Sequence, residues 1–562
     1  MDRPWLRNWP EGKPISVRYP EIPLFEILRN TTRRYPERSA IIFYDKKITY
    51  RELDVLTEKF ATALKDMGVK KGDRVALFLP NIPQFVIGYY GILKAGAVVT
   101  AISPLHEERE IEHELRDSGA KTVVALDLLY SKKMKTIAEK INLNNVIVTS
   151  VTDYLSPLRR LLAPLKGFRA ETIPGTSKFL DLVKKHESDP SPMAINPRED
   201  LAVLQYTGGT TGTPKGVMMT HYNLVANAMQ TYHLARGWRR GEKRQQDGTP
   251  SVLCLIPFFH IYGMTVAMNE GIISGSTLIL IPQFDVQTLL KAIVKYKPQY
   301  FPGTPVMYVT LLNNLGAKKY DFTFLHYCAS GGAPVPVEVI EQFMEVTGAE
   351  LVEGYGLTEA GPVTHCNPVE RAKRRPGSIG IPFPDTDAKI VDLWSGDKDL
   401  LPNEVGELVV RGPQVMKGYW NRPEETNNAL RGGWLYTGDI ARMDEDGYFY
   451  ILDRKKDVLV VSGFRVLPSE IEEALRKHPA VKEAAVVGTP DALRCATNVQ
   501  AFVVLKKDYE GKVTTDDLVK FCEGALTIHK VPNLIEFRKE LPKTPGGKIF
   551  RRALREAIIA SE

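Results

Sequence analysis

Short apolar runs rich in β-branched residues alternate with stretches of helical periodicity along the N-terminal part of the chain. The runs lie near Val75, Val98, Val123, Leu253 and Leu278. Apolar strands that alternate with helices are typical of parallel sheets covered by helices. The pattern therefore predicts an α/β fold for this part of the chain.

The pattern changes from about Asp387. Closely spaced runs, DAKIVDL, EVGELVVRG and YFYILDR, have glycine and aspartate turns and no long helix between them, which predicts a small antiparallel sheet or barrel. After the basic sequence RKKD a compact unit follows, so we place a domain boundary at Arg454, between domains of residues 1–453 and 454–562. The elements expected in the second domain are a strand, a helix from Pro468, strands at Ala484–Val487 and Val499–Leu505, and a helix near Asp516.

Composition limits the class of protein. Of the 562 residues, 43% are hydrophobic and 25% are charged, as in a folded multidomain enzyme. The net charge of +7 is mild and favours acidic ligands such as nucleotides, without indicating nucleic acid. The five cysteines are far apart and never spaced as a metal clip, so we expect reduced thiols in the cytoplasm. No signal peptide is evident, and no run reaches the roughly 18 apolar residues of a membrane span.

The sequence YTGGTTGTPKG, from Tyr206 to Gly216, combines glycines, threonines and one lysine. It lies between the apolar run LAVLQY and VMMTHYNLVANAM, whose apolar residues recur at helical spacing, so we expect a loop that enters a helix. Glycines let backbone N–H groups converge on an anion, and Lys215 adds a positive charge. The mononucleotide pattern G-x-x-x-x-G-K-[ST] does not fit, because Pro214 precedes the lysine. The motif indicates a phosphate cradle, and taken alone it would be equally consistent with a flexible glycine–threonine turn.

Three further motifs follow. EGYGLTEAG offers an aromatic face at Tyr355 for a base and a carboxylate at Glu359 for magnesium. WLYTGDIARMDEDGYFYILDRKKD places Asp439 in a glycine turn, where a carboxylate can accept two ribose hydroxyls, and Arg454 beyond the next hairpin. LPKTPGGKIFRR puts Lys548 on a glycine-rich loop in a basic tail. Each residue alone has a structural explanation, as core, turn or solvated charge.

With four motifs in this order, the sequence resembles the acyl-adenylate-forming enzymes from ITYRELD at Ile48 to Lys548. The resemblance implies an α/β multidomain fold, with a large N-terminal domain of two α/β subdomains plus a small β-barrel, and a small mobile α+β C-terminal domain. It also implies an AMP-forming acid–thiol ligase that uses ATP, Mg²⁺ and coenzyme A. A carboxylate attacks the α-phosphorus of ATP, pyrophosphate leaves, and a thiol then attacks the acyl-AMP.

The resemblance also implies a role for each motif residue. The catalytic residues would be Lys548, which bridges carboxylate and α-phosphate, Glu359, and His260, which contacts or gates the acyl carboxylate. Lys456 matches the hinge of the C-terminal domain, and Gly463 borders the tunnel for the pantetheine arm. Thr207 and Glu359 would bind magnesium. The remaining nucleotide contacts would be Gly208, Gly209, Thr210, Thr211, Gly212 and Lys215 at the phosphates, and Gly332, Glu353, Gly354, Tyr355, Gly356, Thr358, Asp439 and Arg454 at the nucleoside and its surroundings.

The acid is indicated by the sequence CLIPFFHIYG. Family members that activate amino acids carry an aspartate just after this strand, where this chain has Phe258, Phe259 and His260. The small residues of SGGAP, Ser330 to Pro334, leave room for a tail. We predict a medium- to long-chain fatty acid and greatest likeness to the long-chain fatty acid–CoA ligases. The alternatives are an aryl acid such as a hydroxycinnamate, or transfer to a carrier protein; the intact Lys548 disfavours a non-catalytic nucleotide sensor.

The segment YLSPLRRLLAPLKGF, residues 154–168, spaces leucines on one helical face and basic residues elsewhere. Such a helix can lie on a membrane interface, although Pro164 interrupts it. It can equally face the core or a second copy of the chain. Peripheral membrane contact and a homodimer are therefore both open.

Overall fold

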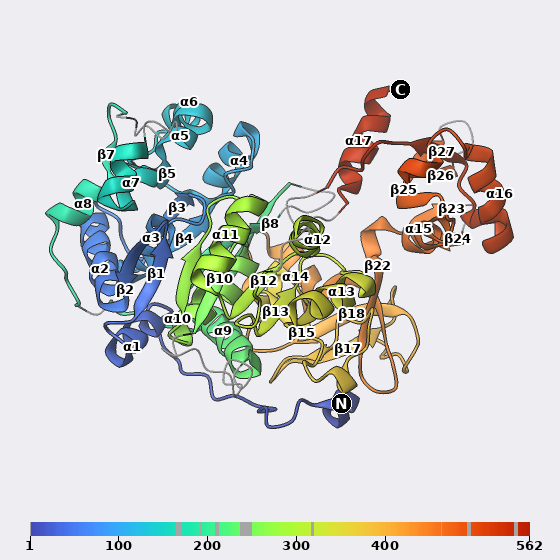
Figure 1. Cartoon of the computed structure of the whole chain (residues 1–562), viewed down its shortest axis with the longest axis horizontal. Coiled ribbons are helices and arrows are strands. Elements are labelled where there is room, and N and C mark those ends of the chain that lie inside the picture. The colour runs from blue at the N-terminus through green and yellow to red at the C-terminus, as the bar shows by residue number, and fades with distance from the viewer. Residues whose placement is uncertain are drawn as a thin grey trace.

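The computed structural model describes residues 2–163, 171, 173–191, 193–207, 213–235, 250–315, 320–461, 464–491, 496–543 and 549–561. A large body holds the N-terminal elements, and a smaller one holds the C-terminal elements (Figure 1). The two meet near β22 (Phe449–Arg454). This arrangement confirms the predicted large N-terminal and small C-terminal parts.

The first sheet has eight strands. Its central strands are parallel, and two strands pair antiparallel at one edge. In spatial order they are β19 (Gly418–Tyr419), β9 (Lys215–Thr220), β8 (Leu201–Thr207), β4 (Val98–Ala101), β3 (Arg74–Phe78), β5 (Thr122–Leu126), β6 (Asn145–Thr149) and β7 (Ser177–Lys178). Helices of this region include α1 (Glu26–Arg34), α2 (Tyr50–Asp66), α3 (Pro83–Lys94), α4 (Glu108–Ser118), α6 (Lys135–Lys140) and α8 (Phe179–Lys185).

The second sheet has nine strands and the same parallel centre. In spatial order they are β16 (Ile381–Pro382), β15 (Val363–Cys366), β14 (Glu350–Gly356), β13 (Tyr327–Ser330), β12 (Tyr300–Gly303), β10 (Ser251–Cys254), β11 (Thr277–Leu280), β1 (Ser39–Phe43) and β2 (Lys46–Thr49). Neighbouring helices are α9 (His221–Ala235), α10 (Glu270–Ile273), α11 (Val286–Tyr296), α12 (Pro305–Asn314) and α13 (Val337–Thr347). The five predicted apolar runs are thus confirmed as β3, β4, β5, β10 and β11.

One apolar core joins the two sheets. It contains residues of β3 and β4 from the first sheet, of β10 and β11 from the second, and of α3 and α9. Every residue of α3 is buried, which explains why that helix is apolar all round rather than amphipathic. The shared core fixes the position of one sheet relative to the other.

The third sheet is antiparallel and open, which corrects the barrel expected from the resemblance. Its strands are β17 (Asp387–Val391), β18 (Gly406–Arg411), β21 (Trp434–Met443) and β20 (Leu430–Arg431), and β22 also pairs with β21. Among the described residues β17 and β22 do not pair with each other. The start of β22 instead bridges to Gly380, next to the second sheet, so this sheet is extended toward its neighbour rather than closed on itself.

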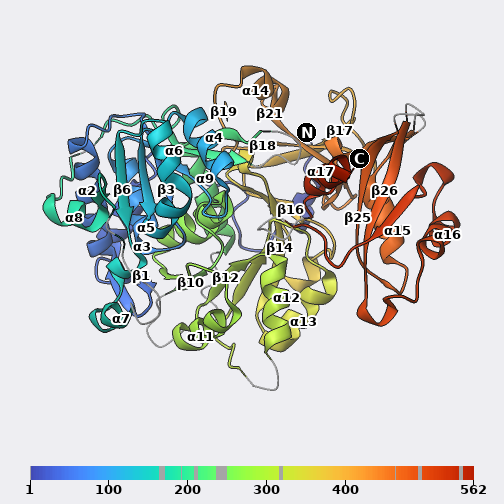
Figure 2. The same ribbon diagram turned by 90° about the horizontal axis from the view of Figure 1, so that it is seen from above.

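The C-terminal part has its own sheet and apolar clusters. Strands β25 (Val481–Asp491) and β26 (Ala496–Leu505) are antiparallel, and β27 (Leu534–Phe537) joins β26 in parallel. Helices α15 (Pro468–Arg476) and α16 (Thr515–Ala525) pack on one side and α17 (Arg551–Ser561) on the other (Figure 2). A short hairpin, β23 (Leu459–Val461) with β24 (Phe464–Val466), precedes them. The α+β unit predicted after Arg454 is confirmed.

The predicted amphipathic segment is described only up to residue 163. Helix α7 (Pro157–Leu162) leaves Leu158 and Leu161 68% and 76% exposed. Arg159 pairs with Asp45 at 2.7 Å, which holds the helix near the β1–β2 hairpin. In the part of the chain that the structure describes, we find no helix with the length and apolar character to cross a membrane.

A buried ion cluster ties α17 to the domain boundary. The Arg551 guanidinium lies 2.8 Å from Glu472 of α15 and 3.4 Å from Asp457. Arg555 adds a second contact to Asp457, at 2.9 Å. Because the carboxylates are almost fully buried, their charges depend on these arginines for compensation.

We expect Arg551→Met to lower the free energy of unfolding of the C-terminal domain by about 3 kcal/mol, because the buried Glu472 carboxylate loses its arginine and Asp457 keeps only Arg555. Lys477→Met removes only an exposed pair with Glu473 and should cost less than about 0.5 kcal/mol. Hydrogen exchange of the backbone amides of β25 and β26, followed as a function of denaturant concentration, measures the free energy of unfolding of both variants. Equal protection in the two variants would contradict the role of the cluster.

Candidate active site

The predicted phosphate loop joins two antiparallel strands, which corrects the expectation that it enters a helix. β8 ends at Thr207, whose pairing partner is Lys215, the first residue of β9. Helix α9 begins only at His221. Residues 216–220 pair with β8, and 217–218 also pair with β19, so these edge pairings favour a strand over a helix. Of the predicted loop residues, Gly208, Gly209, Thr210, Thr211 and Gly212 lie outside the described residues.

Helix α4 contacts both ends of this loop. His113 Nε2 donates a hydrogen bond to the Pro214 carbonyl oxygen at 2.9 Å, just before the lysine. The Tyr206 hydroxyl donates to Asp117 Oδ2 at 2.7 Å, at the end of β8. Arg422 Nη2 pairs with the other oxygen of Asp117 at 2.8 Å. Sequence reasoning missed these α4 residues, because no local motif marks them.

The candidate magnesium ligand Glu359 lies in the short helix η6 (Thr358–Ala360), which also contains Thr358. Its Oε1 accepts a hydrogen bond from the Tyr419 hydroxyl at 2.8 Å. The Lys215 ammonium lies 4.9 Å from the centroid of the Tyr419 ring. One aromatic side chain therefore links the lysine of the phosphate loop to the candidate metal ligand.

The donor set fits magnesium bound mainly through substrate. Within the described residues no three His, Cys, Asp or Glu side chains form a metal cluster. Magnesium typically keeps several waters and takes one or two protein oxygens together with substrate phosphates. Glu359 and the Thr207 hydroxyl can supply such oxygens, whereas a metal held by protein alone does not fit.

The candidate nucleoside contacts Tyr355, Asp439 and Arg454 lie together. Asp439 and Arg454 are opposite each other on β21 and β22, and Arg454 Nε lies 2.6 Å from Asp439 Oδ1. The Tyr355 hydroxyl donates to Asp439 Oδ2. Asp439 lies in a strand and is 1% exposed, which corrects its placement in a glycine turn. Its cross-strand partner explains the difference, since the pair is satisfied only in an extended strand.

Two adjacent parallel strands supply the rest of this region. β13 and β14 pair so that Ser330 is opposite Glu353, and a Cβ on Gly331, next to Gly332, would lie 3.5 Å from the Gly354 carbonyl oxygen. Ligands of open α/β sheets bind at the carboxyl ends of the strands. A Cβ on Gly356 would lie 2.1 Å from the Pro362 carbonyl oxygen, so only glycine fits there.

Glu353 is buried, and burial raises the pKa of its carboxyl group to about 8. The carboxyl group is therefore mostly neutral near pH 7. A neutral group at this position avoids repulsion of a bound nucleotide. Its neighbour Tyr355 packs at 5.9 Å against the ring of His365, which burial keeps neutral by lowering its pKa to about 3.

His260 lies between the phosphate loop and the β13 end. Gln205 of β8 donates from Nε2 to the Phe259 carbonyl at 3.0 Å, and Tyr262 donates from its hydroxyl to the Ala329 carbonyl at 2.9 Å. These two bonds fix the segment on either side of His260. The His260 side chain is exposed, and its Nδ1 accepts the Tyr262 N–H at 3.2 Å. Phe258 is buried against Phe85 and so contributes to the core.

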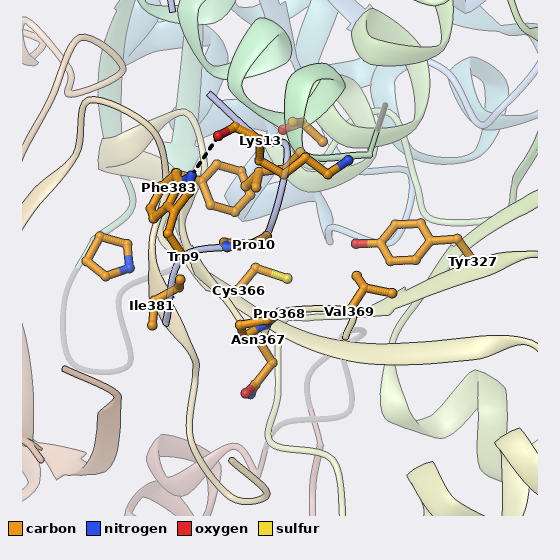
Figure 3. Close-up of a pocket in the computed structure, with 13 residues that line it drawn as sticks. Trp9, Pro10, Lys13, Tyr327, Cys366, Asn367, Pro368, Val369, Ile381 and Phe383 are labelled. Carbon is orange, nitrogen blue, oxygen red and sulfur yellow. Dashed lines mark hydrogen bonds between the residues drawn. The ribbon is translucent and has the colours of Figure 1, made fainter. Parts of the chain in front are cut away.

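An apolar cavity lies close to Gly354 of β14 (Figure 3). The cavity is small, with a volume of about 40 Å³, and Lys13 is its one cationic residue among the described lining residues. Cys366 lines it, and Cys366 Sγ lies 3.9 Å from the place of a Cβ on Gly354. Other lining residues are Trp9, Leu234, Tyr327, Val369 and Phe383.

The remaining predicted residues belong to the C-terminal part. Lys456 is exposed in the short helix η8 (Lys455–Asp457), directly after Arg454. Gly463 and Lys548 lie outside the described residues. The structure thus forms two groups of predicted residues. Strand pairing and Tyr419 connect Thr207, Lys215 and Glu359, and side-chain contacts connect Tyr355, Asp439 and Arg454, with Lys456 at the boundary.

Comparisons with known proteins identify relatives of this chain. The sequence model of the AMP-binding enzyme matches residues 28–420, and that of the AMP-binding enzyme C-terminal domain matches residues 470–548. A long-chain-fatty-acid–CoA ligase of Bacillus subtilis (strain 168) is 46% identical over 99% of this chain and 98% of that protein. ATP-bound MatB from Rhodopseudomonas palustris has a TM-score of 0.81 at 28% identity, over 95% of this chain and 98% of that one. A long-chain-fatty-acid-CoA ligase (FadD1) from Archaeoglobus fulgidus has a TM-score of 0.69 at 27% identity, over 93% and 98%.

The chain belongs to the AMP-binding enzyme family. Members of this family activate a carboxylate with ATP through an acyl-AMP. The class of enzyme is therefore an AMP-forming acid–thiol ligase.

The raised pKa of Glu353 predicts a pH-dependent stability. The native carboxyl keeps its proton up to about pH 8, whereas the unfolded chain releases it near 4.5, so the free energy of unfolding falls as pH rises between these values. Glu353→Gln has no such proton. We expect it to match the wild type near pH 5 and to exceed it by about 3 kcal/mol at pH 8, measured by denaturant unfolding. If the free energies of unfolding of the wild type and of Glu353→Gln changed in parallel with pH, the raised pKa of Glu353 would be contradicted.

Proposed function

We propose that the protein is an ATP-dependent fatty acid–CoA ligase. In the first step a carboxylate oxygen bonds to the α-phosphorus of ATP, and the bond to pyrophosphate breaks. In the second step the CoA sulfur bonds to the acyl carbon, the proton of the thiol is lost, and AMP leaves. The observation that carries the proposal is the grouping of the candidate nucleotide contacts Tyr355, Asp439 and Arg454. The small apolar cavity beside Gly354 is consistent with an apolar acid. The Bacillus subtilis relative, a long-chain-fatty-acid–CoA ligase, supports the same substrate class.

The main difficulty of the first step is electrostatic, because one anion must approach another. Lys215, the loop that it follows and Lys548 would neutralise charge that develops on the phosphates. Magnesium, when bound by Glu359 and Thr207, would neutralise phosphate charge further. Tyr355 would stack on the adenine, and Asp439 with Arg454 would hold the ribose. Gly332 and the 353–358 segment would enclose the base.

The acid is proposed to be aliphatic. Phe258 and Phe259 lie where family members that activate amino acids carry an aspartate, which pairs with the substrate ammonium. The cavity lining is also mainly apolar. His260 would contact the acyl carboxylate from the exposed side of its segment. Two alternatives are an aryl acid as substrate and a carrier protein as thiol donor. Assays across a panel of acids and a panel of thiols distinguish them.

We also propose that the domains of residues 1–453 and 454–562 alternate between two arrangements about Lys456. Arg454 touches the nucleoside group, and Asp457 three residues later belongs to the ion cluster with α17. The boundary is therefore where nucleotide contacts end and C-terminal contacts begin. Alternation would withdraw Lys548 and bring Gly463 to the pantetheine arm.

The exposed apolar face of α7 bears on where the enzyme lies and on whether it binds a second copy. The exposed Leu158 and Leu161 of α7 support peripheral contact with a membrane by a cytoplasmic enzyme. A homodimer through the same face is the alternative, and sedimentation with and without lipid vesicles distinguishes them.

Octanoate through palmitate should drive ATP–pyrophosphate exchange, and free amino acids should not. Burying an ammonium without a partner costs several kcal/mol, enough to remove activity. Hydroxycinnamate serves as the aryl comparison, and CoA is added in a second series. Robust exchange with an amino acid, and none with any fatty acid, would contradict the substrate assignment.

Lys548→Ala should slow acyl-AMP formation by roughly 10²- to 10³-fold while ATP binding changes far less. Thioester formation from synthetic acyl-AMP and CoA should stay near normal, because the second arrangement does not use this lysine. Lys543→Ala is the matched control, since its ammonium pairs with Glu483 at 2.8 Å. Equal loss of both steps in Lys548→Ala would contradict domain alternation.

A further inference from the structure

Tyr419 lies outside every nucleotide motif considered above, yet it contacts two of them. It belongs to β19 and is opposite Val217 of β9. Its hydroxyl donates to Glu359 Oε1 at 2.8 Å, and its ring lies under the Lys215 ammonium at 4.9 Å. No other described side chain connects the phosphate-loop lysine to the candidate metal ligand.

The backbone around Tyr419 is fixed at both neighbours. The Met416 N–H donates to the Glu359 carbonyl at 2.9 Å, so this segment holds the main chain of η6. The Lys417 and Trp420 N–H groups donate to the Met218 and Gly216 carbonyls at 2.9 and 2.8 Å, so the same segment holds β9. The position of the Tyr419 hydroxyl relative to both elements therefore follows from the main chain.

The hydrogen bond constrains Glu359 in one orientation. Oε1 accepts the Tyr419 proton, and among the described residues Oε2 accepts no hydrogen bond. A carboxylate with one oxygen held by a neutral donor keeps its negative charge and presents the second oxygen to a cation. Groups that orient a metal ligand in this way raise metal affinity.

We propose that Tyr419 is a positioning residue that orients the Glu359 carboxylate for the magnesium ion of magnesium–ATP. It acts through Glu359 and does not itself touch a reacting atom. The inference rests on the proposed use of magnesium–ATP, and it is independent of which acid is activated.

The experiment measures ATP binding by calorimetry, without acid or CoA, once with Mg²⁺ and once with EDTA. Tyr419→Phe keeps the ring beneath Lys215 and removes only the hydroxyl. We expect its affinity for magnesium–ATP to fall roughly tenfold, with affinity for metal-free ATP unchanged. A purely structural residue, or one that contacts phosphate directly, would lower both affinities together, and that result would overturn the proposal.

Two control experiments test whether the effect is specific to the Tyr419 hydroxyl and acts through Glu359. Tyr436→Phe removes a comparable hydroxyl, which donates to the Gly396 carbonyl at 2.6 Å in the third sheet, and it should change neither affinity. In a Glu359→Gln background, Tyr419→Phe should have no further effect on magnesium–ATP binding, because the ligand through which it acts has gone. Additive losses in the double variant would overturn the proposal.

The design separates this inference from the substrate assignment. Failure of fatty acids to drive exchange would contradict the proposed acid and leave the binding result standing. If magnesium gave the wild type no gain in ATP affinity, the proposed magnesium role and the role of Tyr419 would both be wrong.

Discussion

The pairing of β9 on both edges is the constraint on which the site depends. β8 places Thr207 opposite Lys215 on one edge, and β19 brings in Tyr419 from far later in the chain on the other. A strand paired on both sides cannot shift its register without breaking both ladders. Thr207, Lys215 and the tyrosine beside them are therefore fixed relative to one another by main-chain hydrogen bonds.

Charge is distributed around this strand in a way that suits a polyanionic ligand. Asp439 is paired with Arg454, and Asp117 with Arg422, so these carboxylates are already compensated. Glu353 is mostly neutral near pH 7 because burial raises its pKa. Glu359 differs, since its described hydrogen-bond partner is a neutral hydroxyl. Arg454 and Lys456 act on Glu359 electrostatically, but among the described residues no ion pair holds it, so its carboxylate is available to the proposed divalent metal.

The domain boundary combines two functions in a few residues. Arg454 is the last residue of β22 and faces Asp439 of the large domain. Asp453 accepts the Ser469 N–H at 2.9 Å, and Asp457 binds arginines of α17, so these neighbours belong to the small domain. Contacts to the two domains alternate along these residues, so the proposed rotation about Lys456 would keep the Arg454–Asp439 pair and would have to break the bond between Asp453 and Ser469.

Local patterns in the sequence were sufficient for the α/β fold and the α+β unit after Arg454, because hydrophobic periodicity is a property of neighbouring residues. The roles of the nucleotide-site residues came from the family resemblance and stay predictions. The local patterns failed where long-range pairing decides the local conformation. Lys215 begins a strand because it pairs with Thr207 of β8 and because residues 217–218 of the same strand pair with β19. Asp439 is extended because Arg454 lies opposite, and the third sheet is open because β22 bridges to Gly380. His113, Asp117 and Tyr419 lie in no motif, since their partners are distant in sequence. The sequence by itself determined which chemical groups the protein carries, and only the tertiary structure decided which of them meet, because such contacts depend on strand order and register rather than on local composition.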